Sequence, residues 1–195
     1  MPSHRAFAPM EELPIPARGP RRERTQRPLY LLLTLGLVIV VLSAGGGAWL
    51  RTTLAPATPS GSLAPDFTLQ TTNNTTIQLR SLRSSVVLVE FFATWCIPCA
   101  VEVGTLAQLH RQYPQLTIIT IGWDRGENAS VLATYGRAHN MTWTIAPDTD
   151  WVGARYGVAG LPTMVLIDQQ QRIVQTYTGL TTTQALTQDL AKLGI

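Results

Sequence analysis

The stretch that decides the fold is FFATWCIPC, residues 91–99. It begins at the end of an apolar, β-branched run, Val86–Phe92, which is typical of a buried strand. A helix over Ile97–Tyr113 is expected to follow, beginning at or near Cys96. The first turn of a helix carries unpaired N–H groups and the positive end of the helix dipole, so it stabilises a thiolate. Cys96 is therefore the expected nucleophile.

The second cysteine, Cys99, lies three positions after Cys96, and the chain has no other. Residues three apart share one side of a helix, and Pro98 is tolerated between them because a first-turn N–H has no partner to lose. Cys96 can attack a disulfide, and Cys99, set deeper, can resolve the mixed disulfide. A structural disulfide framework needs more cysteines at wider spacing, so this pair is predicted to do chemistry.

Two other uses of a CxxC pair involve metals. A structural zinc site needs two more ligands, and the histidines of the predicted domain, His110 and His139, are not spaced as a metal-binding pair. We therefore expect no zinc. Two soft thiolates can also hold Cu(I), so an extracytoplasmic Cu(I) metallochaperone is the alternative function. Met141 and Met164 are expected in the core rather than beside the thiolates.

The formal net charge of +3 comes from the N-terminal part of the chain. Residues 1–28 carry six Arg and three Glu, whereas residues 62–195 carry eight basic and nine acidic side chains. A globular part without a basic excess does not attract polyphosphates. Nucleic acid is therefore not an expected partner.

Four segments are predicted along the chain. Residues 1–28 form a disordered basic tail, because they are rich in Pro, Arg and Glu and have no apolar periodicity. Residues 29–50 contain no charge and are long enough to cross a bilayer core of about 30 Å as a helix. Residues 51–62 form a linker rich in Pro, Ser and Thr. The domain occupies residues 63–195.

The charges around the predicted membrane helix set its orientation. Six Arg precede residues 29–50, and Arg51 follows them. Basic residues stay on the cytoplasmic side, so the N-terminus is expected in the cytoplasm and the domain on the extracytoplasmic face of the cell membrane. A cleaved signal peptide is the alternative, since the small residues around Ser43–Gly45 could serve a protease.

Strands that alternate with helices predict an α/β domain around a central sheet. The expected strands are Phe67–Gln70, Thr76–Leu79, Val86–Phe92, Leu116–Gly122, Trp143–Ala146, Met164–Asp168 and Ile173–Tyr177. The expected helices are Ile97–Tyr113, Ala129–His139 and Thr183–Leu193, with a helical turn at Trp151–Tyr156. In the first helix we expect Val101, Leu106 and Leu109 to face the core.

Glu90 is unusual because it lies inside an apolar strand. Alternation puts it on the same face as Leu88 and Phe92. An unpaired carboxylate there would cost free energy. We therefore predict that Glu90 is a partly buried proton carrier with a raised pKa. The alternative is a Glu near the strand end that reaches solvent.

These features together resemble the thioredoxin superfamily, and within it the TlpA/ResA-type membrane-anchored thiol–disulfide oxidoreductases. Three motifs carry the resemblance, which covers about residues 63–193: Ala64-Pro65-Asp66-Phe67 with Leu69, the stretch 91–99, and the run from Asp148 through Tyr156-Gly157-Val158-Ala159-Gly160-Leu161-Pro162-Thr163 to Leu166-Ile167-Asp168. The resemblance implies a thioredoxin-like fold, with a central mixed sheet flanked by helices.

The resemblance also implies how the substrate binds. Pro162 matches the family's cis-proline, so the Leu161–Pro162 bond is expected to be cis and its loop to lie beside the two cysteines. We expect the substrate chain to bind against Leu161 and Pro162 of that loop, and against Trp95 and Pro98 around the nucleophile. Trp95 could instead be an ordinary core aromatic.

Two carboxylates match family positions. Glu102 matches the acidic residue of the CxxCxxE pattern, where it could bias the thiols or guide a partner, or could be a solvated helix charge. Glu90 lies six before Cys96, where thioredoxins have a buried Asp that moves a proton to or from the resolving thiol. Ala100 and Gly104 depart from the bulky or basic residue and the Pro that the family often has there.

The implied activity is disulfide exchange with exported proteins. Reduction is favoured, with the haem-binding cysteines of apocytochrome c as one substrate class, and it would need electrons from a membrane partner. No cofactor beyond the Cys96–Cys99 disulfide is expected. The first motif is shared with peroxiredoxins, but their P-x-x-x-T-x-x-C arrangement is absent around Thr94, which argues against a peroxidase.

Overall fold

The computed structural model describes residues 60–195. The predicted basic tail (1–28), the predicted membrane helix (29–50) and most of the predicted linker (51–62) lie outside the described residues. Within the described part, no helix is both long enough and apolar enough to cross a membrane.

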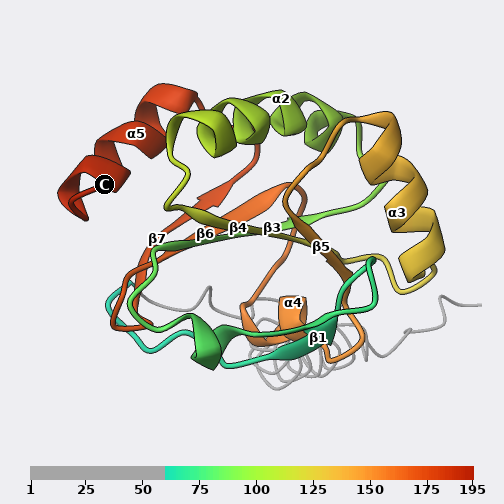
Figure 1. The fold of residues 1–195 in the computed structure, drawn as a ribbon, viewed down its shortest axis with the longest axis horizontal. Coiled ribbons are helices and arrows are strands. Elements are labelled where there is room, and N and C mark those ends of the chain that lie inside the picture. Colours follow the sequence, from blue (N-terminus) through green and yellow to red (C-terminus); the bar gives the residue numbers. More distant parts are fainter. Residues whose placement is uncertain (1–59) are drawn as a thin grey trace, which may run out of the picture. The chain divides into compact units, whose positions relative to one another are not determined.

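The centre of the domain is a five-stranded mixed sheet in the order β5-β4-β3-β6-β7 (Figure 1). Strand β3 (Val87–Phe92) lies in the middle and is buried at every position. It pairs in parallel with β4 (Thr117–Gly122), which pairs in parallel with β5 (Thr144–Pro147). On the other side, β6 (Thr163–Ile167) and β7 (Ile173–Thr178) continue the sheet antiparallel.

Both faces of the sheet are covered, which is why β3 is apolar at every position except Glu90. Figure 1 shows α2 (Ile97–Gln112), α3 (Ala129–Ala138) and α5 (Thr183–Lys192) on one face. The other face carries α4 (Val152–Arg155), the hairpin of β1 (Thr68–Gln70) and β2 (Thr76–Gln78), and a 3₁₀ turn at Leu79–Leu82.

The alternation along β3 divides the interior into two apolar clusters. Leu88 and Phe92 pack under α2, α3 and α5. Val87, Val89 and Phe91 pack against the hairpin and α4 on the opposite face. The side chain of residue 90 therefore belongs to the α2 side, and this places it beneath the helix that carries the cysteines.

The expected elements are present, and each boundary differs from the prediction by at most one residue. The prediction that Val101 faces the core is wrong, since its exposed fraction is 61%. The buried side of α2 is formed by Cys99, Glu102, Val103, Leu106 and Leu109. Val101 is two positions from Cys99, which is more than half a turn of helix, so it points to solvent.

Two glycines offer a matched test of this packing. A Cβ on Gly122, at the end of β4, would lie 2.6 Å from Cδ1 of the buried Leu132, whereas a Cβ on Gly104 in α2 would meet nothing within 4 Å. We expect Gly122→Ala to lower the free energy of unfolding by about 1–3 kcal/mol through overpacking. Gly104→Ala should raise it by about 0.5–1 kcal/mol through helix propensity. Urea unfolding of both variants checks this, and equal effects would contradict it.

Candidate active site

The two cysteines lie where the central strand passes into the first long helix. Strand β3 ends at Phe92, and Cys96 is the N-cap of α2 with an extended backbone. Its sulfur accepts a hydrogen bond from the backbone N–H of Cys99 at 3.2 Å. The two residues form a disulfide, with their Cα atoms 5.2 Å apart. Cys96 is 5% exposed and Cys99 is fully buried, so an incoming sulfur reaches Cys96 first.

The Leu161–Pro162 peptide bond is cis, as expected from the sequence. Its loop lies beside the cysteines, because Leu161 lines one cavity together with Trp95, Cys96 and Pro98. This cavity has a volume of about 380 Å³. Pro162 itself is buried, and its carbonyl accepts a hydrogen bond from the N–H of Gly179. The structure therefore brings the predicted substrate-binding residues together around the nucleophile.

The loop before the cis-proline presents free backbone groups. Among the described residues, the N–H groups of Ala159, Gly160 and Leu161 have no hydrogen-bond partner within the chain. The Gly160 carbonyl accepts from the Thr163 hydroxyl at 2.8 Å. Unpaired backbone N–H groups can donate hydrogen bonds to the carbonyl groups of another chain.

Trp95 lies at the surface, with an exposed fraction of 62%, so it is not a core aromatic. Its indole N–H donates a hydrogen bond to Oδ2 of Asp124 at 2.6 Å. This hydrogen bond, and a second one from the Gly126 N–H, lower the pKa of the Asp124 carboxyl. The side chain that covers the nucleophile is thus held by an ionised carboxylate on the β4–α3 loop.

The same loop holds the backbone just before the nucleophile. Glu127 is almost completely buried, and its Oε1 accepts hydrogen bonds from both the N–H and the hydroxyl of Thr94. Glu127 and Asp124 were not predicted from the sequence. Their position directly after a buried parallel strand could have indicated them. Neighbouring parallel strands end at one edge of the sheet, so residues that follow β4 lie near residues that follow β3.

Glu90 is fully buried on the α2 side of the sheet, so the alternative of a solvent-reaching side chain is wrong. Its Oε2 accepts a hydrogen bond from the Thr120 hydroxyl at 2.7 Å, and that hydroxyl accepts one from the Trp143 indole at 2.9 Å. The other oxygen, Oε1, has no partner. Burial raises the pKa of Glu90 to about 8; the Thr120 hydrogen bond opposes the rise, and the charge of Glu102 adds to it.

Glu102 is also buried, with an exposed fraction of 1%, so the alternative of a solvated helix charge is wrong. Its Oε2 accepts a hydrogen bond from the N–H of Thr181, in the β7–α5 loop, at 3.1 Å. Its Oε1 has no partner, and burial raises the pKa of this carboxyl. Two buried carboxyl groups, Glu90 on β3 and Glu102 on the buried side of α2, therefore lie in the interior near the cysteines, each with a raised pKa.

A pair of thiols such as Cys96 and Cys99 could also coordinate a metal ion. Within residues 60–195, no group of three or more His, Cys, Asp or Glu side chains is arranged to hold a metal ion. His110 packs against the Trp143 ring, and His139 stacks on Tyr135. Met141 and Met164 are buried in the core, as predicted.

Comparison with known proteins agrees with this geometry. The sequence profile of the AhpC/TSA family matches residues 60–176. The thiol-disulfide oxidoreductase ResA of Bacillus subtilis is 28% identical over 166 residues, which cover 84% of this chain and 92% of that protein. ResA of Geobacillus thermodenitrificans is 30% identical over 134 residues, which cover 68% of this chain and 77% of that protein.

Solved structures show the same fold. A Chlorobium tepidum protein described as a thiol:disulfide interchange protein DsbE superposes with a TM-score of 0.64 at 25% identity, covering 69% of this chain and 97% of its own. A Bacteroides thetaiotaomicron protein described as a protein disulfide isomerase gives 0.63 at 26% identity, covering 73% and 94%. The fold is therefore thioredoxin-like, as expected from the sequence.

The raised pKa of Glu90 predicts how stability depends on pH. The unfolded chain releases this proton near pH 4.5, whereas the folded protein holds it to about pH 8. Between these values the native state binds more protons, so stability falls as pH rises, by at most about 1.4 kcal/mol per pH unit. Glu90→Gln should flatten this slope in urea unfolding of the oxidised protein. An unchanged slope in Glu90→Gln would show that Glu90 is not the titrating group.

Proposed function

Because the chain belongs to the AhpC/TSA family and is a thioredoxin-like thiol–disulfide oxidoreductase, we propose that it reduces disulfides of extracytoplasmic proteins through Cys96 and Cys99. The observation that carries this proposal is the arrangement of the two sulfurs. Cys96, at the N-cap of α2, is slightly exposed, whereas Cys99 is fully buried, and the pair lies beside the unpaired backbone N–H groups of the cis-proline loop. The first sulfur can attack a partner, and the second can release it.

The proposed reaction starts from the reduced pair. The Cys96 thiolate attacks one sulfur of a substrate disulfide, that S–S bond breaks, and the other substrate sulfur leaves as a thiolate that takes up a proton. Cys99 then attacks the Cys96 sulfur of the mixed disulfide. The Cys96–Cys99 disulfide forms, the second substrate thiol leaves, and two electrons have passed to the substrate.

Glu90 is the proposed proton carrier for the second step. It lies on the same face of β3 as Leu88 and Phe92, which share one apolar cluster with Cys99. Its pKa of about 8 lies close to neutral pH, so the carboxyl can both accept and donate a proton there. Removal of the Cys99 proton by the Glu90 carboxylate would make Cys99 the attacking thiolate, in a place that bulk water does not reach. Glu102 is proposed to act on the thiols through its charge.

Steady reduction needs a source of electrons. A thiol or dithiol donor associated with the membrane would return the Cys96–Cys99 disulfide to the dithiol by the reverse exchange. Residues 29–50 are proposed to anchor the chain, with residues 1–28 in the cytoplasm and the domain on the outer face. The uncharged stretch and the Arg-rich segment before it support this arrangement. Proteins of cytochrome c maturation are a proposed substrate class.

The roles of the two cysteines can be separated by trapping. A reduced Cys99→Ser variant should form a stable mixed disulfide with a peptide disulfide, because nothing remains to resolve it. Cys96→Ser is the matched control, and it should form none over the same time, since Cys99 is fully buried. Mass spectrometry under non-reducing conditions measures both. Equal adducts from the two variants would contradict the assignment.

The direction of electron flow is tested by the reduction potential of the Cys96–Cys99 pair. The purified full-length chain, held in detergent, is equilibrated with thiol buffers, and the fraction oxidised is measured. We expect a potential near about −270 mV, the value of the reductant thioredoxin. A value near about −120 mV would indicate an oxidant of exported proteins instead. Stoichiometric Cu(I) binding without any reversible couple would favour the metallochaperone.

A further inference from the structure

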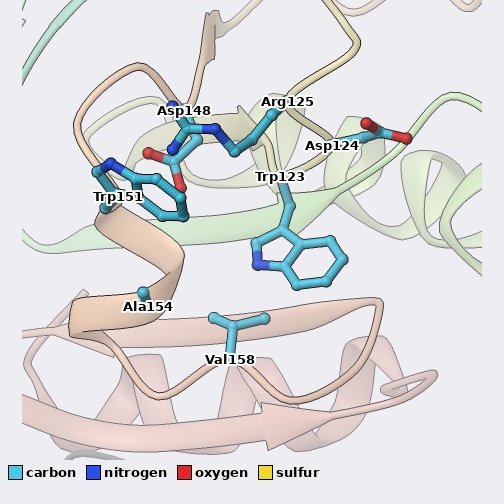
Figure 2. Close-up of a pocket in the computed structure, with 7 residues that line it drawn as sticks. All are labelled: Trp123, Asp124, Arg125, Asp148, Trp151, Ala154 and Val158. Atoms are coloured by element: carbon cyan, nitrogen blue, oxygen red, sulfur yellow. The ribbon is translucent and has the colours of Figure 1, made fainter.

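A second cavity, of about 420 Å³, lies next to the active-site cavity. Figure 2 shows the residues that line it. Trp123, the first residue after β4, lines both cavities. The second cavity is therefore a neighbour of the surface at which Cys96 would meet its substrate. Its volume lies within the range of about 300–1,000 Å³ in which proteins bind small groups.

Two indole rings shape this cavity. Trp123 lies so close to α4 that a Cβ added to Gly153 would be 2.4 Å from its Cδ1 atom. Trp151, just before α4, has a left-handed backbone with a φ of 54° and a side chain that is 60% exposed. A bulky residue is uncommon in this conformation, which here turns the indole out over the cavity (Figure 2).

The charged groups around the cavity differ in availability. Asp148 uses both carboxylate oxygens on the N–H groups of Val152 and Gly153, at 2.8 and 2.9 Å. The Arg125 guanidinium lies 3.5 Å from the centroid of the Trp151 ring, and no carboxylate of the described residues forms a salt bridge with it. The cavity therefore offers aromatic faces and the Arg125 guanidinium stacked on Trp151. The carboxylate of Asp148 is already hydrogen-bonded to backbone N–H groups.

The loop before the cis-proline connects the two cavities. Val158 lines the second cavity, and the residues that follow it, Ala159 to Leu161, line the active-site cavity with free N–H groups. A substrate chain paired with this loop would run from Cys96 toward Trp123 and Val158. Alternate side chains of such a strand point to the same side, about 6.6 Å apart, so one of them meets the cavity.

We propose that the second cavity is a specificity subsite, which takes an aromatic side chain of the substrate polypeptide a few residues from its reacting cysteine. The inference rests on the proposed function, since it needs a polypeptide at Cys96. An aromatic ring fits the site because it can pack against the Trp123 and Trp151 indoles and beside the Arg125 guanidinium. The two cavities share Trp123 and are lined by consecutive residues of one loop, Val158 and then Ala159 to Leu161, so a polypeptide bound at Cys96 is the occupant that can reach the second cavity.

The test uses the reduced full-length protein and a series of alanine-rich peptides. Each peptide has one cysteine in a mixed disulfide with thionitrobenzoate, whose release is followed by absorbance. A single Phe is moved through the four positions on either side of the cysteine. The peptide with Phe at one of these positions should react about tenfold faster than the all-alanine peptide, as expected when a side chain fills an apolar pocket. Its immediate neighbours should show no gain, because their side chains point away.

Two variants change the shape of the cavity in different ways. Trp151→Ala removes one wall, and Gly153→Ala displaces Trp123. In both variants the Phe peptide and the all-alanine peptide should react at about the same rate. A cooperative unfolding transition in urea should show that each variant is folded. Val131→Ala is the matched control, since Val131 is an exposed apolar residue on α3 and does not line the cavity. It should keep the preference.

The outcomes separate the inference from the proposed function. Rapid reaction of every peptide at one common rate would overturn the subsite and leave the oxidoreductase intact. A Phe preference that persists in both Trp151→Ala and Gly153→Ala would also overturn it. Failure of the wild-type protein to react with any peptide or with the symmetrical thionitrobenzoate disulfide would overturn both.

Discussion

The structure depends on one junction, where the central strand β3 ends and α2 begins at Cys96. The hydrogen bond from the Cys99 N–H to the Cys96 sulfur fills the N-cap position, so the group that starts the helix is also the reactive one. The strand before it is buried on both faces, and this fixes the junction relative to the sheet. The cis-proline loop and the β4–α3 loop then converge on the same edge, since β4 and β6 are the neighbours of β3.

Burying carboxyl groups on the strand and the helix of this junction costs stability. Glu90 and Glu102 each keep one oxygen without a hydrogen-bond partner, and both pKa values are raised by burial. An apolar side chain at either position would pack without that cost. Buried groups that weaken the fold and have perturbed pKa values are typical of functional sites. The same burial that costs stability thus places the proposed proton carrier, Glu90, where bulk water does not reach.

Local patterns were enough to predict the sheet, the redox helix and the burial of Glu90, because each depends on alternation or on residues adjacent in the chain. The cis bond at Pro162 was expected through resemblance, and the structure confirms it. Val101 was misplaced because an apolar residue near the start of a helix does not by itself reveal which side is buried. Asp124 and Glu127 were missed because their contacts with Trp95 and Thr94 join residues about 30 positions apart.

The proposed substrate recognition at this site has two kinds of contact. The free N–H groups of residues 159–161 would bind any extended chain, because every polypeptide has carbonyl groups to offer. Such contacts give affinity without discrimination. Discrimination needs a pocket that rewards one side chain, and the cavity between Trp123 and Trp151 is built from side chains rather than backbone. In the proposed function, a general strand contact is thus combined with one selective contact, at a fixed distance from the sulfur that reacts.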